Sequence, residues 1–115
     1  MSRADSDATV AEMANGHRTA ELRSIGLHRL VVEHLRSEPE LLDRARDRVT
    51  GWVEDGYPVP PSVANRWREL LGRPLPEILA ALVEDSEVAR DMRQSSPFAG
   101  VLTQDERAAV IRRTR

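Results

Sequence analysis

Cysteine is absent from all 115 residues of this chain. Its absence excludes a disulfide framework, a cysteine-based zinc site and thiol redox chemistry. A chain of this length can bury about two thirds of its unfolded surface in a single core. We therefore expect one domain that folds without metal or disulfides, in a compartment compatible with reduced conditions.

Lysine is absent as well, so all 17 basic side chains are arginine, and they face 19 acidic ones. The resulting net charge of -2 excludes phosphate-driven attraction to nucleic acid as a property of the whole molecule. Any contact with DNA would have to be local. We interpret the arginine-only usage as the coding bias of a GC-rich genome, although arginine also forms two-point hydrogen bonds to carboxylates at protein interfaces.

Long apolar runs are missing too. Nowhere do about 18 apolar residues follow one another, and the first ten residues, MSRADSDATV, lack the basic start and apolar run of a secretory signal. The sequence therefore predicts a cytoplasmic protein with no membrane association.

The stretch Thr19–Arg36 is the one around which we expect the fold to be organised, because its apolar residues leave a helix on two sides. At about 100° per residue, we place one group on one side and a second group opposite. The first group is Leu22, Ile25 and Val32, and the second is Leu27, Leu30, Val31 and Leu35. This pattern predicts a central helix packed on two faces.

Further helices with one apolar face each are predicted around this centre, over residues 40–53, 62–71, 75–84, 86–93 and 104–115. Their boundaries carry local signals. Ser37 is expected to cap the second helix, Gly56 to end it, and Thr103 with Glu106 to form a capping box for the last. The predicted fold is all-α, a compact domain of five to six helices around Thr19–Arg36.

Residues 1–18 are polar and small, with few apolar anchors at helical spacing. Such a segment is either mobile or a short, loosely docked helix, and we expect it to be mobile. The remaining residues 19–115 are expected to form the single helical domain.

Signatures of catalysis and metal binding are also missing. His28 and His34 point about 120° apart on a helix, and His17 lies outside it, so they are not placed to share an ion. We expect each histidine at the edge of the helix packing. Ser95 and Ser96 lack both a glycine-framed elbow and a histidine within local reach. We therefore predict a protein that is not an enzyme and that carries no metal or cofactor.

Two segments raise the question of DNA binding. The predicted hairpin of residues 62–84 has the outline of a helix-turn-helix, but its second helix offers acids and no basic residue, which phosphates would repel. The C-terminal segment is a better electrostatic candidate, because its arginines exceed its acids. It could contact DNA or an acidic protein surface, and arginines there also complement the helix dipole. Its arginines are Arg107, Arg112, Arg113 and Arg115.

The loop at residues 94–102 contains the chain's single phenylalanine, Phe98. An apolar insert in a chain so poor in aromatics fills either its own core or a partner's pocket. We favour its own core, and the alternative stays open.

Two stretches, ELRSIGLHRLVVEHLRSEPELLDRAR at 21–46 and EVARDMRQSSPFAGVLTQDER at 87–107, resemble a group of small proteins of GC-rich bacteria, especially actinobacteria. Members of that group are often encoded beside nucleotidyltransferase-like or other toxin genes and are taken to be antitoxins. The resemblance implies a non-enzymatic protein that neutralises a toxin by binding it, and possible repression of its own operon. The chain departs from many antitoxins in having no obvious DNA-binding module and no long toxin-wrapping tail.

Our sequence-based hypothesis is thus an antitoxin-like protein that occludes the active site of a toxin encoded next to it. We expect its arginines to pair with carboxylates of the partner and Phe98 to fill a pocket. The alternative is a small transcriptional regulator of its own operon, and a homo-oligomer is left open. The predicted partner-binding residues are Arg90, Arg93, Gln94, Phe98, Arg107, Arg112 and Arg113.

Overall fold

The computed structural model describes the backbone of residues 2–114 and the side chains of residues 18–114. Over that range the chain forms helices and connections without a strand. The helices are α1 (Ser2–Ser37), α2 (Leu41–Asp55), α3 (Pro61–Leu71), α4 (Leu75–Leu82), α5 (Glu87–Arg93) and α6 (Gln104–Arg113). The predicted all-α fold of five to six helices is confirmed.

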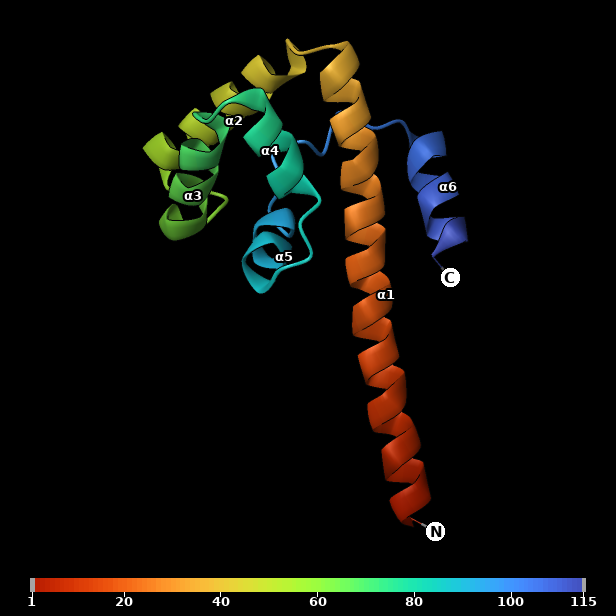
Figure 1. Cartoon of the computed structure of the whole chain (residues 1–115). Helices are drawn as coiled ribbons and strands as arrows, with labels where there is room; N and C mark the ends of the chain where they lie inside the picture. Colours follow the sequence, from red (N-terminus) through yellow and green to blue (C-terminus); the bar gives the residue numbers. More distant parts are fainter. Residues whose placement is uncertain (1, 115) are drawn as a thin grey trace.

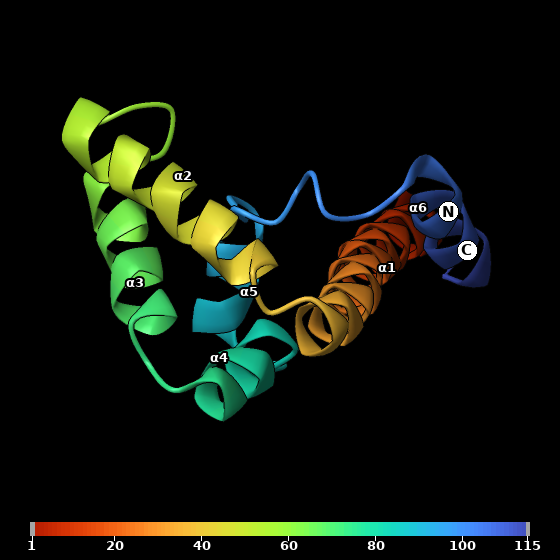
Figure 2. The ribbon, with the colours of Figure 1, turned by 90° about the horizontal axis from the view of Figure 1, so that it is seen from above.

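Helix α1 lies between two groups of helices (Figures 1 and 2). It contacts α2, α4 and α5 on one side and α6 on the other, while α3 packs against α2. The prediction of a central helix packed on two faces is therefore confirmed. The predicted membership of these faces is wrong, because Val32 and Leu35, which we placed on opposite sides, belong to one core cluster. Residues three apart on a helix lie on the same face.

The start of the central helix also differs from the prediction, since α1 begins at Ser2 instead of Thr19. Arg18, the last residue of the predicted mobile segment, forms ion pairs with Glu21 at 3.2 Å and Asp85 at 3.3 Å. The side chains of residues 1–17 lie outside the described residues. The predicted mobility of that segment therefore stays a prediction.

Local signals placed most helix ends correctly. Thr103 N–H donates to Glu106 Oε1 at 2.9 Å and Glu106 N–H donates to Thr103 Oγ1 at 3.1 Å, which is the predicted capping box. Gly56 ends α2 with φ 68°, a left-handed conformation that glycine adopts without strain.

The cap predicted for Ser37 is wrong. Ser37 is the last residue of α1, and α2 starts after Glu40 with no side-chain cap. A residue before proline avoids the helical region, so Pro39 forces the chain out of α1 at Glu38 and leaves Ser37 inside the first helix.

The core lies between α1, α2, α3 and α4 and is closed by the loop that follows α5. The aromatic rings of Trp67 and Phe98 meet edge to face within it, with centroids 6.1 Å apart and an angle of 72° between the rings. This pair joins α3 to the loop. The largest fully buried side chains are Trp67, Phe98, Leu35, Leu71, Ile78, Leu82 and Val49.

Candidate protein-binding surface

The predicted partner-binding residues do not form one surface. Arg90, Arg93 and Gln94 lie on α5 or at its end, whereas Arg107, Arg112 and Arg113 lie on α6. These two helices are on opposite sides of α1 (Figures 1 and 2). One partner segment therefore cannot contact both groups without crossing α1.

Phe98 is only 2% exposed and packs against Trp67. The expectation that it fills the protein's own core is confirmed. Its assignment to a partner's pocket is corrected, because a ring enclosed by its own core is not available to a second molecule in this structure.

Arg93 is likewise unavailable, at 5% exposed. Its Nη1 donates hydrogen bonds to the carbonyl oxygens of Glu84 at 2.7 Å and Leu82 at 3.3 Å, at the C-terminal end of α4. A guanidinium there satisfies carbonyls that have no partner within the helix. Burial lowers the pKa of Arg93. Its assignment to the partner surface is corrected, because its role is to close α4.

Two further arginines make contacts within the protein. Arg90 Nε lies 3.2 Å from Glu21 Oε1, which ties α5 to α1, and Arg107 Nη2 donates to the Ala99 carbonyl, which holds the loop before α6. Both remain partly exposed. The members of the predicted set that are exposed are Gln94, Arg112 and Arg113.

A groove of about 570 Å³ runs between α1 and α6. We call it the α1–α6 groove. Leu22, Leu30 and Val110 give it apolar walls, and Leu22 is 43% exposed, which is unusual for a large apolar side chain on the central helix. Its lining residues are Thr19, Leu22, Gly26, Arg29, Leu30, Glu33, Val110, Arg113 and Thr114.

Gly26 allows the two helices to approach closely at this groove. A Cβ atom at position 26 would lie 3.0 Å from Val110 Cγ1, which is shorter than an ordinary contact between carbon atoms. Gly51 is likewise isolated inside a helix, α2, but has no atom within 4 Å of the corresponding position. A glycine inside a helical pattern therefore could not reveal this approach from the sequence alone.

Side chains fasten α6 to α1 at both ends. Arg23 Nε donates to Thr114 Oγ1 at 3.2 Å at one end, and His34 Nε2 lies 2.8 Å from Glu106 Oε2 at the other. The pKa of Glu106 is lowered, first by the hydrogen bond from the Thr103 backbone N–H and then by the one from His34. The groove therefore has walls held in place by contacts at each end of α6.

The charge around the groove is positive. Arg29 and Arg113 line it and Arg112 is adjacent in the sequence, and none of the three forms an ion pair with the side chains of residues 18–114. Glu33 is the acidic residue in the lining. An apolar hollow with unpaired guanidinium groups favours an occupant that carries both an apolar side chain and carboxylates.

The fold also brings together a histidine and a serine that are far apart in the sequence. His28 Nε2 lies 2.9 Å from Ser96 Oγ, and Nδ1 lies 2.7 Å from the Ser24 carbonyl oxygen. His28 is 6% exposed, so its predicted place at the edge of the packing is wrong. With Nδ1–H donating to the carbonyl, the neutral ring accepts from the Ser96 hydroxyl.

A serine beside a neutral imidazole is the pair used in nucleophilic catalysis. Here neither residue lines any of five cavities among residues 18–114. Ser96 Oγ also accepts the Phe98 N–H at 3.2 Å. The pair therefore links the loop that positions Phe98 to the centre of α1.

His28 should make stability depend on pH. Burial lowers its pKa from 6.5, so the folded state favours the neutral ring. The free energy of unfolding should be highest above pH 6.5 and fall as the pH drops from there towards the folded-state pKa, by about 1.4 kcal/mol for each unit of the shift. Urea unfolding between about pH 7.5 and 5 measures this slope.

The variant His28→Gln is the control, since glutamine retains hydrogen-bonding groups but does not titrate. For this variant we expect the free energy of unfolding to change less between about pH 7.5 and 5. Equal slopes for the two proteins would contradict the assignment. Glu106 affects stability in a different pH range. Because its pKa is lowered in the folded state, the stability that it contributes is lost only as the pH falls below about 4.5, the ordinary pKa of a glutamate.

Comparisons with known proteins returned no match: no family model, no curated protein and no solved structure resembles the chain closely enough to be matched. The antitoxin resemblance therefore stays a prediction. Among the described residues, no helix combines the length and hydropathy needed to cross a membrane. The described side chains also include no group of three or more histidines and acids placed to hold a metal ion.

Proposed function

We propose that this protein is an antitoxin-like binding protein that neutralises a partner enzyme by occluding it, and that the α1–α6 groove is its principal contact surface. The observation that carries the proposal is the exposed Leu22 in a hollow bordered by Arg29 and Arg113, which form no ion pair with the side chains of residues 18–114. The resemblance of residues 21–46 and 87–107 to antitoxins supports the same function. A non-enzymatic role is part of the proposal.

The groove suggests what the partner offers. Fully burying a side chain of the size of leucine contributes about 1.5–3 kcal/mol, so an apolar residue seated against Leu22 and Leu30 would anchor the complex. Arg29 and Arg113, which line the same groove, would pair with carboxylates near that anchor. We therefore expect an acidic segment of the toxin that carries one large apolar residue.

The outline of α1 favours an extended contact. Its backbone continues past α6 towards the N-terminus (Figure 1). A helix that projects from the rest of a domain gains little stability by itself, so contacts with a partner would stabilise it.

Co-expression with the neighbouring gene tests the proposal. The neighbouring protein alone should arrest growth, and adding this chain should restore growth and yield a complex that purifies as one species. Leu22→Asp should weaken the complex by more than about tenfold, because it places a buried charge in the apolar contact. Tyr57→Asp, at a 75% exposed apolar residue on the α2–α3 connection, is the matched control and should leave binding unchanged.

Unrelieved growth arrest together with the absence of a complex would reject the proposed function. A complex that tolerates Leu22→Asp as well as Tyr57→Asp would reject the groove as the contact surface while leaving neutralisation intact.

Local binding to DNA is the second candidate, because Arg112 and Arg113 are exposed at the end of α6 and form no ion pair within the described part of the chain. The α3–α4 hairpin does not favour it, since α4 contains Glu77 and no basic residue. A regulator of its own operon should bind its promoter with an affinity that falls steeply with salt. No binding at low salt would remove this candidate.

A further inference from the structure

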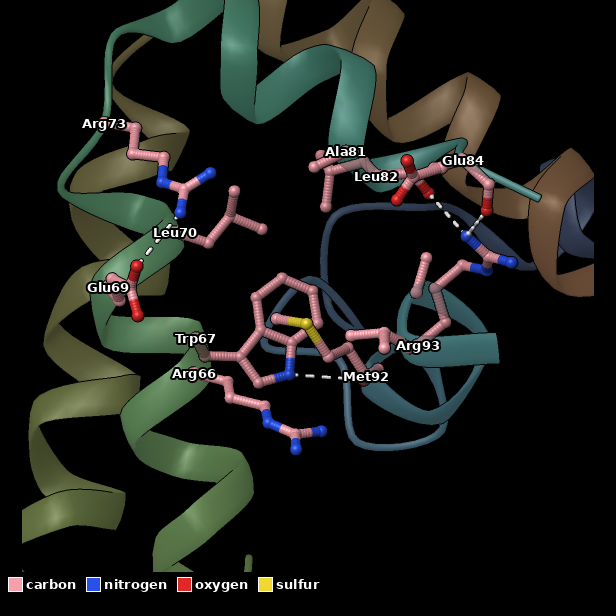
Figure 3. Close-up of a pocket in the computed structure, with 12 residues that line it drawn as sticks. Arg66, Trp67, Glu69, Leu70, Arg73, Ala81, Leu82, Glu84, Met92 and Arg93 are labelled. Atoms are coloured by element: carbon pink, nitrogen blue, oxygen red, sulfur yellow. Dashed lines mark hydrogen bonds and ion pairs between the residues drawn. The ribbon is translucent and has the colours of Figure 1, made fainter. Parts of the chain in front are cut away.

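A second hollow, of about 280 Å³, opens between α3, α4 and α5 and shares no lining residue with the α1–α6 groove (Figure 3). The indole of Trp67 is fixed in its wall, because Nε1–H donates to the Met92 carbonyl oxygen at 3.2 Å. Most of the residues that line the hollow are apolar. Their apolar members are Trp67, Leu70, Ala81, Leu82, Val88, Ala89 and Met92.

Two arginines from α3 and its C-terminal end stand at the mouth of this hollow. Figure 3 shows Arg73 and Arg66 at opposite ends of the row that Leu70 and Trp67 form along α3. Arg73 Nη2 is paired with Glu69 Oε1 at 2.9 Å. Arg66 forms no ion pair and donates no side-chain hydrogen bond within the described part of the chain, so its guanidinium is free to meet an anion.

Arg93 adds a buried positive charge to the same wall. Its Nε and Nη2 are buried and have no hydrogen-bond partner among residues 18–114, and its Nη1 meets only carbonyl oxygens. No carboxylate lies within ion-pair distance of it in that range. The lining as a whole has three arginines against two glutamates.

We propose that this hollow binds a small organic anion, with its apolar body against Ala81, Val88 and Met92, which are accessible, and its carboxylate at Arg66. The volume of the hollow is slightly smaller than that of common ligand pockets, which start at about 300 Å³. We therefore expect an occupant with a single ring and a short side chain that ends in a carboxylate. The inference goes beyond the proposed function and does not depend on it.

Phenylacetate is the probe, and phenylacetamide is its uncharged control of nearly the same shape. The two tryptophans give two indole N–H signals in an amide NMR spectrum, and Trp52→Phe identifies them. Phenylacetate should shift the indole signal of Trp67, which lines the hollow. It should leave the signal of Trp52 unchanged, because Trp52 does not line the hollow. The amide should bind about tenfold more weakly or worse, because it lacks the charge that Arg66 recognises.

Two variants separate the charge from the cavity. Arg66→Gln should weaken phenylacetate binding about tenfold, whereas Arg68→Gln, on the same helix but lining a different hollow, should have no effect. Ala81→Leu should abolish binding by filling the space. Circular dichroism checks that each variant keeps its helical content.

Equal binding of acid and amide, or an Arg66→Gln protein that binds as well as wild type, would overturn the assignment of an anion. If neither probe shifts the Trp67 indole signal at millimolar concentration, the proposal that the hollow is a binding site is wrong. Because neither result requires the toxin partner, failure here is distinct from failure of the proposed function.

Discussion

Phe98→Ala is expected to lower the free energy of unfolding by about 3–5 kcal/mol, measured by urea denaturation at neutral pH. The ring is 2% exposed and meets Trp67 edge to face, so its removal loses both the transfer of apolar surface and the aromatic contact and leaves a cavity. A domain of this size has a total stability of about 5–15 kcal/mol. The variant should therefore lose a large share of the stability of the domain, which lowers its abundance in cells.

Phe98→Leu is the control for this prediction, because it keeps an apolar side chain in the cavity and should cost less than the alanine variant. The pair of variants also decides between the two roles considered for Phe98. If the ring filled a partner's pocket instead of its own core, Phe98→Ala would leave the free energy of unfolding unchanged and abolish the complex. That outcome would contradict the observed packing.

Leu35→Ala should have the second large effect, a loss of about 2–5 kcal/mol of unfolding free energy. Leu35 is completely buried in the core face of α1 together with Val31 and Val32. Leu22→Ala on the same helix is the matched control and should change stability by at most about 0.5 kcal/mol, because Leu22 is exposed in the α1–α6 groove.

Comparable losses for Leu35→Ala and Leu22→Ala would mean that both faces of α1 are equally packed, and the groove would then not be an open surface. The same Leu22→Ala protein is useful beyond stability. It should fold normally and yet bind a partner more weakly, which separates binding from folding at a residue that belongs to the groove.

Helix boundaries were predictable where the signal is a contact between near neighbours in the chain. The Thr103–Glu106 capping box and the left-handed Gly56 involve residues at most four apart, and each was predicted correctly. The cap predicted at Ser37 was wrong because the capping signal of the serine competed with the helix-ending signal of Pro39. Pro39 decided the end of α1, and the serine hydroxyl then fell inside the helix.

The binding surface was not predictable in the same way. Arg93 and Arg112 look alike in the sequence, yet one closes the end of α4 and the other is exposed on α6. The difference depends on where α4 and α6 lie relative to α5 and α1. The link between His28 and Ser96 spans 68 positions, so no local spacing rule could have suggested it.

By itself, the sequence determined that this chain is all-α, where most of its helices begin and end, and that cysteine chemistry is excluded. Those properties follow from composition and from hydrogen bonds between residues a turn apart. Only the tertiary structure decided which face of α1 is core, which arginines are occupied by contacts within the protein, and where apolar hollows remain open. Such properties depend on packing between distant segments, since a side chain is buried or free only relative to the helices that surround it.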